Sequence, residues 1–239
     1  MLRRRAALVL VLWSVAVPRH ARAQWFVAGY LGANATRSAT VGIDVPGEQI
    51  SLEYHDVAFE ARPFESPQYY GFRVGRMFGA ARRFGVEVES VHLKLFADTT
   101  RVYETTGSFG SSLILRTPEM NAIVQRFAMT HGLNFLVANL VTRFPLGSAV
   151  SLIARGGAGP TLPHGETTVL GRQRDQYEFA GLGVHAAAGL DVRLRGGLSL
   201  VGEYKFTYAR PEIDLAAGTG RTTAASHHVA FGLAFGLSR

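Results

Sequence analysis

Histidines and acidic residues are the side chains of this sequence best suited to chemistry. Of eight histidines, seven follow residue 23, and six of these fall near the same ends of the segments described below: His55, His92, His131, His164, His227 and His228. Acidic residues occur in the same regions: Asp56, Glu60, Glu65, Asp98, Glu166 and Glu178. Imidazoles beside carboxylates are used for general acid–base catalysis and for metal binding. The alternative is that histidine is tolerated at a membrane interface and that the clustering is chance.

Recognised sequence motifs do not show which reaction or ligand these residues would serve. The sequence has no Gly-x-Ser-x-Gly nucleophile elbow. Its glycine-rich pieces lie within expected strands, whereas a phosphate-binding loop needs a following helix. No histidine spacing matches a metal motif, and the adjacent His227 and His228 would point to opposite faces of a strand. A functional site at this end is therefore a hypothesis from clustering alone.

The element that must position these residues is a two-faced strand. In residues 178–194 one set of alternate positions is wholly apolar, from Ala180 to Leu194, whereas the other set is small or ionisable and includes His185 and Asp191. Strict alternation predicts a β-strand with unlike faces. A strand that crosses a bilayer needs about 9–11 residues with this apolar-out, polar-in pattern.

Seven further segments resemble this one, which gives eight expected strands. Four long connections alternate with three short turns between them, as in outer-membrane barrels, which have an even number of strands and short periplasmic turns. The predicted fold is all-β, an eight-stranded antiparallel transmembrane β-barrel with long outer loops and short periplasmic turns. A soluble barrel of the lipocalin kind, with its apolar face inside, is the competing fold. The expected strands cover residues 24–34, 69–78, 84–96, 123–144, 150–159, 178–194, 198–209 and 227–237.

Charged residues recur on the inner face of the expected barrel. An eight-stranded barrel is filled by its own side chains, so we expect a salt-bridged polar plug; an open pore is the alternative. In the third strand the apolar phase changes after Glu89, and a bulge near Ser90 would keep His92 and Lys94 facing inward. The expected inward charges are Arg73, Glu87, Glu89, Arg143, Arg155, Asp191, Arg193, Glu203 and Lys205.

The beginning of the chain indicates export. A basic start, an apolar run and the sequence Ala21-Arg22-Ala23 are typical of a cleaved signal peptide, so we expect a signal peptide over residues 1–23 and an outer-membrane β-barrel domain over residues 24–239. Without residues 1–23 the chain has 20 basic and 18 acidic residues. That small excess argues against a nucleic-acid partner. The chain has no cysteine, so it has no disulfide framework.

Four phrases of the sequence carry a family resemblance: "FESPQYYGFRVGRMF", "VEVESVHLKLFADTTR", "FAMTHGLNFL" and "GEYKFTYARPEIDL…HHVAFG". They resemble bacterial outer-membrane β-barrel proteins, in particular the lipid A oxidase group. The resemblance implies an oxygen-dependent oxidation of the proximal glucosamine of lipid A at the outer leaflet. It also implies lipid A as a partner, and we expect a monomer in outer-membrane lipid. A non-catalytic structural or adhesive barrel is the alternative function.

The resemblance brings no catalytic signature, so site residues are assigned from the histidine cluster. We expect His92, His131, His164 and His228 to supply the base or to hold a divalent metal, the cofactor that such residues would suit. We expect Glu166 or Glu178 to orient them. Lys205 and the pair Arg172 and Arg174 are the expected clamp for lipid A phosphates, as cations bind anionic head groups.

Overall fold

Eight long strands form one antiparallel barrel, which confirms the predicted fold class. The computed structural model describes residues 24–110, 112–113 and 119–237; the expected signal peptide, residues 1–23, lies outside the described residues. The barrel strands are β1 (Gln24–Thr36), β5 (Tyr70–Phe78), β6 (Phe84–Ala97), β9 (Val124–Pro145), β10 (Val150–Val169), β12 (Leu182–Arg193), β13 (Leu198–Ala209) and β16 (Ala224–Leu237).

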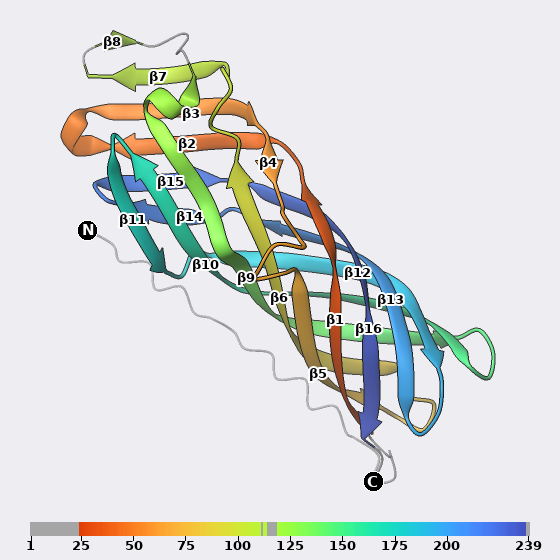
Figure 1. The fold of residues 1–239 in the computed structure, drawn as a ribbon. Helices are drawn as coiled ribbons and strands as arrows, with labels where there is room; N and C mark the ends of the chain where they lie inside the picture. Colours follow the sequence, from red (N-terminus) through yellow and green to blue (C-terminus); the bar gives the residue numbers. More distant parts are fainter. Residues whose placement is uncertain (1–23, 111, 114–118, 238–239) are drawn as a thin grey trace, which may run out of the picture.

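The barrel closes where its first and last strands meet. β1 pairs with β16 from Trp25–Leu237 to Thr36–Ser226, and each remaining strand pairs with its neighbours in the order β1, β5, β6, β9, β10, β12, β13, β16. The turns that join β5 to β6, β9 to β10 and β12 to β13 are short and lie at one end (Figure 1). The other connections are long and lie at the opposite end. Outer-membrane barrels place the short turns in the periplasm, so we call the opposite end the outer end.

The barrel wall is apolar outside and polar inside. In β12, Leu182, Val184 and Leu190 are exposed, whereas His185 and Asp191 are buried in the interior. This arrangement excludes the lipocalin alternative, in which the apolar face would be inside, and it suits a wall immersed in lipid. The same outward apolar set on other strands includes Phe72, Val74, Val86, Val88, Leu136, Leu140, Leu200, Phe231 and Leu233.

The protein is therefore an outer-membrane barrel that spans the bilayer with strands. Helices in the described residues are limited to the 3₁₀ segments η1 (Pro46–Glu48) and η2 (Met120–Ala122). No helix among the described residues has the length and apolar character to cross a membrane.

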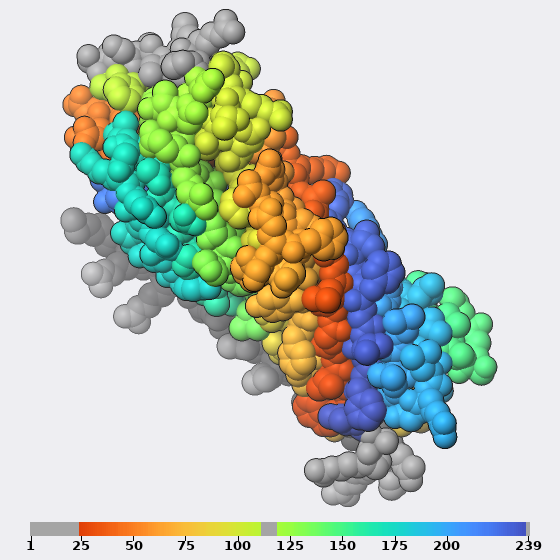
Figure 2. Space-filling model, in the orientation of Figure 1, coloured from red at the N-terminus to blue at the C-terminus, as the bar shows by residue number. Residues whose placement is uncertain are grey.

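Beyond the barrel, the long outer connections are built as a second sheet rather than as loops. The strands pair in the order β14, β15, β2, β3, β7, β8, and the space-filling view shows this outer half continuing the barrel as a packed body (Figure 2). Its strands are β2 (Ala39–Val45), β3 (Ile50–Val57), β7 (Thr105–Phe109), β8 (Ser112–Leu113), β14 (Glu212–Leu215) and β15 (Gly218–Thr222). Two further short strands, β4 (Phe59–Glu60) and β11 (Arg172–Tyr177), pair with β6 and β10.

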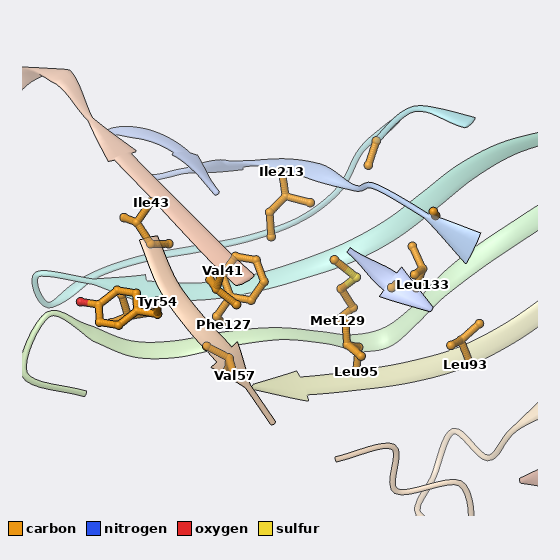
Figure 3. Close-up of a cluster of buried hydrophobic side chains, with 14 of the residues drawn as sticks. Val41, Ile43, Tyr54, Val57, Leu93, Leu95, Phe127, Met129, Leu133 and Ile213 are labelled. Carbon is orange, nitrogen blue, oxygen red and sulfur yellow. The ribbon is translucent and has the colours of Figure 1, made fainter. Parts of the chain in front are cut away.

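An apolar core closes the outer end of the barrel. Side chains of the second sheet, including Ile43 and Tyr54, belong to one buried apolar cluster with Phe127 and Met129 on the extended part of β9 (Figure 3). The same buried cluster continues down into the barrel to Phe135. Buried apolar side chains pack as densely as organic crystals, so the outer end is sealed.

Below this core, the interior holds a buried and balanced set of charges. Three cations, Arg73, Arg155 and Lys205, face three carboxylates, and each of the six side chains is at most 8% exposed. Lys205 Nζ lies 2.5 Å from Glu89 Oε1; Arg73 Nη2 lies 2.6 Å from Glu203 Oε1. The third carboxylate is Glu87, 3.0 Å from Arg155 Nε. We call this set the lumen ion cluster; it is the expected salt-bridged plug.

Two strands differ from the sequence prediction. In β6 the phase does not change at Ser90: Val91, Leu93 and Leu95 face the interior like Glu89, because the interior itself changes from charged to apolar at this level. His92 consequently points away from the interior, where neighbouring residues cover it so that it is 3% exposed, and the register shift falls between Leu93 and Leu95. β10 continues to Val169, through residues predicted to form a loop.

Candidate functional site

The strongest candidate site lies on the outer wall where β9 and β10 leave the barrel. Pro163 pairs with Leu133 and Gly165 with Met129, so three residues of β9 oppose the single residue His164. This bulge includes Gly132, with a positive φ of 97°, and it brings His131 against His164. Their Nδ1 atoms are 3.3 Å apart, and the rings meet edge to face with centroids 4.6 Å apart. Bulges often redirect a side chain beside a functional site.

Strand β11 supplies the carboxylate of this site. Leu170 and Gly171, both with positive φ, form a two-residue hairpin turn that returns the chain antiparallel to β10. Asp175 Oδ1 then lies 2.9 Å from His164 Nε2. Tyr177 pairs with His164 in register, and its ring centroid is 4.4 Å from the imidazole.

The contact with Asp175 sets the tautomer of His164 when both imidazoles are neutral. Because Asp175 accepts, His164 Nε2 carries the hydrogen and His164 Nδ1 is an acceptor. His131 Nδ1 can donate to it, and the Thr130 hydroxyl oxygen lies 3.3 Å from His131 Nδ1 and 3.4 Å from His164 Nδ1. With His131 Nδ1 as the donor, the lone pair is on His131 Nε2, and His131 is exposed on the outer wall. The chain of three residues can therefore take up a proton at His131 Nε2.

His92 joins the same patch through an asparagine. Asn134 Oδ1 is 2.9 Å from His92 Nδ1, and Asn134 Nδ2 donates to the backbone oxygen of His131. On its other side the His92 ring stacks on Tyr70, with centroids 4.7 Å apart. We call His92, Asn134, His131, His164 and Asp175 the outer-wall site. Three of the four predicted histidines thus come together.

The fourth predicted histidine, His228, lies apart from the outer-wall site. It faces the barrel interior, 1% exposed, with Nε2 2.9 Å from Thr207 Oγ1 and its ring beside Tyr69. The neighbouring His227 faces outward, near Tyr204. Alternation along β16 separates the two, as expected for adjacent residues of a strand.

The two predicted acidic residues do not contact the imidazoles. Glu166 pairs with Arg126, with Oε1 2.7 Å from Nε. Glu178 Oε2 accepts a hydrogen bond from the backbone of Asp214, and burial raises the pKa of the Glu178 carboxyl. The orienting carboxylate is instead Asp175, which the sequence prediction missed because β11 was read as a loop. The short turn at Gly171, followed by alternating residues, is the signal that could have revealed it.

The predicted phosphate clamp is not assembled in the structure. Lys205 is fully buried in the lumen ion cluster, so it has no access to a lipid head group. Arg172 and Arg174 alternate with Asp175 along β11 and lie on its other face, where they pair with Glu48 and Asp214. Arg126, paired with Glu166 on the wall of β9 and β10, is a cation near the outer-wall site.

The donor set does not fit a metal centre. Among the described residues no group of three or more His, Cys, Asp or Glu side chains has a metal-binding arrangement. We therefore derive only proton handling from these residues.

Comparisons with known proteins give only distant structural likenesses. No protein-family model matches the sequence, and no curated protein matches it. Among solved structures, the chain is similar to the outer membrane protein AlkL, with 10% identity, a TM-score of 0.47, and coverage of 100% of this chain and 98% of that one. The outer membrane protease OmpT from Escherichia coli is 8% identical, with a TM-score of 0.46 and coverage of 90% of this chain and 97% of that one. Neisserial surface protein A is 10% identical, with a TM-score of 0.40 and coverage of 88% of this chain and 96% of that one. Likenesses this distant carry no information on activity.

Proposed function

We propose that this outer-membrane barrel modifies lipid A from its lipid-facing wall, with the outer-wall site as its active site. The observation that carries the proposal is the directed chain from Asp175 through His164 to His131, which leaves a basic nitrogen on the outer wall. Lipid A lies in the outer leaflet, beside the outer part of that wall. A substrate there reaches the site sideways from the membrane, without entering the barrel.

The reaction class follows from the resemblance to lipid A oxidases, which implies oxidation of the proximal glucosamine to an aminogluconate. The ring hemiacetal and dioxygen give a lactone and hydrogen peroxide, so two electrons pass from the anomeric carbon to dioxygen, and water then opens the lactone to the acid. In this scheme His131 Nε2 accepts the proton of the anomeric hydroxyl, and Asp175 stabilises the positive charge that spreads to His164. Arg126 is the nearby cation on the wall that can attract a phosphate of the substrate.

A non-catalytic barrel is the second candidate, and the interior supports it. The balanced lumen ion cluster and the apolar core close the interior above its short-turn end, so no continuous channel passes through the described residues. Such a closed barrel needs no activity to be stable. A structural or adhesive role would use the outer sheet alone.

Mass spectrometry of lipid A separates the two candidates. In a host without such an oxidase, expression of the gene should add one oxygen to the proximal sugar. His131→Gln should abolish this product, and Asp175→Asn should reduce it on the order of 100-fold, within the range of a general base contribution. His227→Gln is the matched control, because His227 is another outward-facing imidazole beside a tyrosine.

Folding is checked by the heat-dependent mobility of the barrel on gels. Unchanged lipid A with folded wild-type protein in the outer membrane would refute the oxidase and leave the structural barrel. Equal loss of product in His131→Gln and His227→Gln would refute the assignment of the site.

A further inference from the structure

The barrel interior opens at its short-turn end as a cavity of about 310 Å³. Every barrel strand except β6 contributes residues to the lining of this cavity. The turn just before β6 contributes Arg82. It runs from Gln24 and Arg82 at the mouth to Arg73 and Arg155, at the base of the lumen ion cluster. Small-molecule sites are concave and commonly have a volume of about 300–1,000 Å³, so this cavity has room for a small ligand.

Charge in the mouth of this cavity is not balanced. The lumen ion cluster at its inner end is neutral, with three cations and three carboxylates. Nearer the opening, Arg82, Arg143 and Arg193 face a single carboxylate, Asp191. Arg143 Nη2 lies 3.1 Å from Asp191 Oδ2, and Arg82 donates to the side-chain oxygen of Gln24. Two positive charges are therefore left without an acidic partner among the described residues that line the cavity.

Unused hydrogen-bond donors lie on the same lining. Arg73, 1% exposed, keeps an Nε that has no hydrogen-bond partner, and the Nε of Arg143 is likewise unpartnered. Buried polar groups in proteins are almost always hydrogen-bonded, so a buried guanidinium nitrogen without a partner suggests an acceptor from outside the chain. Guanidinium groups match the oxygens of phosphate and carboxylate in geometry and in charge.

We propose that this cavity binds a soluble, multiply charged anion that carries phosphate or carboxylate groups and enters from the periplasm. A membrane lipid is not the ligand, because the continuous ladders around the barrel leave no lateral opening. Arg143 and Arg193 bind its oxygens, whereas Asp191 competes with it for Arg143. The site is independent of the outer-wall site and faces the other side of the membrane.

Calorimetric titration of the full chain, purified in a neutral detergent without phosphate buffer, tests this site. The probes are inorganic pyrophosphate and citrate. We expect one anion per barrel; the preferred probe shows whether phosphate or carboxylate is recognised. Arg143→Gln and Arg193→Gln should each weaken binding on the order of 10-fold, since each removes charged hydrogen bonds.

Two further variants make the outcome independent of damage to the fold. Asp191→Asn should strengthen binding, because it frees Arg143 from its competing carboxylate; damage to the fold would only weaken it. Arg195→Gln makes the same charge change on the neighbouring turn, outside the cavity lining, and should leave the affinity unchanged. Absence of binding for both probes, or equal weakening by Arg195→Gln and Arg193→Gln, would overturn the proposal.

Discussion

Removal of Lys205 from the lumen ion cluster is the sharpest test of how this interior is stabilised. Its Nζ lies 2.5 Å from Glu89 Oε1, 3.3 Å from Glu203 Oε1 and 2.6 Å from the hydroxyl of Tyr30. In Lys205→Met, two cations would face three carboxylates, with one negative charge left unbalanced at a position that is wholly buried.

The expected cost can be worked out from these distances. At an effective dielectric constant of about 20, two unit charges about 2.5 Å apart attract by about 6–7 kcal/mol, part of which offsets the loss of hydration. Removal of one partner of a buried pair typically costs about 3–5 kcal/mol. We therefore expect Lys205→Met to lower the free energy of unfolding by about 3–5 kcal/mol.

Urea unfolding in lipid vesicles measures this change, with the fluorescence of Trp25 on the outer wall as the signal. The paired variant Lys205→Met with Glu89→Gln removes one charge of each sign and leaves the cluster neutral. It should recover about 1–3 kcal/mol relative to Lys205→Met alone, the range of coupling between contacting residues.

A loss below about 1 kcal/mol in Lys205→Met would refute the view that the balance of charge stabilises the interior. A double variant no more stable than Lys205→Met would refute the pairing with Glu89. Either result would mean that packing and the other hydrogen bonds of the cluster dominate.

Two smaller changes test the packing inside the barrel and in the outer sheet. Gly71→Ala would place a Cβ 2.0 Å from the Tyr30 ring, so it should cost about 1–3 kcal/mol of stability in the same unfolding assay; Gly29→Ala, with nothing within 4 Å of the new Cβ, is the matched control and should cost far less. Burial raises the pKa of the Tyr54 hydroxyl to about 12, so its contribution to stability is complete below its ordinary value of about 10 and is lost as the pH rises toward 12. Tyr54→Phe should reduce the slope of stability between pH 10 and 12 without loss of stability at pH 8, because the buried hydroxyl has no hydrogen-bond partner; an unchanged slope would contradict the assignment.

Alternation with period two was sufficient to predict the barrel strands, because each strand separates lipid from the interior. Alternation was less informative where both faces of a strand are buried in similar surroundings. In β6, Val91 and Leu93 were read as a change of face, but both face the interior, where the surroundings change from charged to apolar. Sequence alone cannot show that change, because it depends on the second sheet packed above.

The candidate site was predicted in part. His131 and His164 were placed at the same end, and the register of β9 and β10 brings them into contact. Asp175 was missed because its contact depends on the hairpin of β10 and β11. Lys205 was expected both among the inward charges and in a phosphate clamp; its contacts with Glu89 and Tyr30 agree with the first and leave it unavailable for the second.

The second sheet also has a consequence for the order of assembly. Its strands come from three separate connections; residues 41–44 of β2, for example, pair with residues 219–222 of β15. Because residues so far apart in the chain must first be brought together, we expect β2 and β15 to pair only after β1 has met β16. Until then one edge of β2 and one edge of β15 are unpaired backbone that an external protease can cleave. Resistance of the outer half to a protease added to intact cells would therefore mark the moment at which an individual molecule completes its maturation.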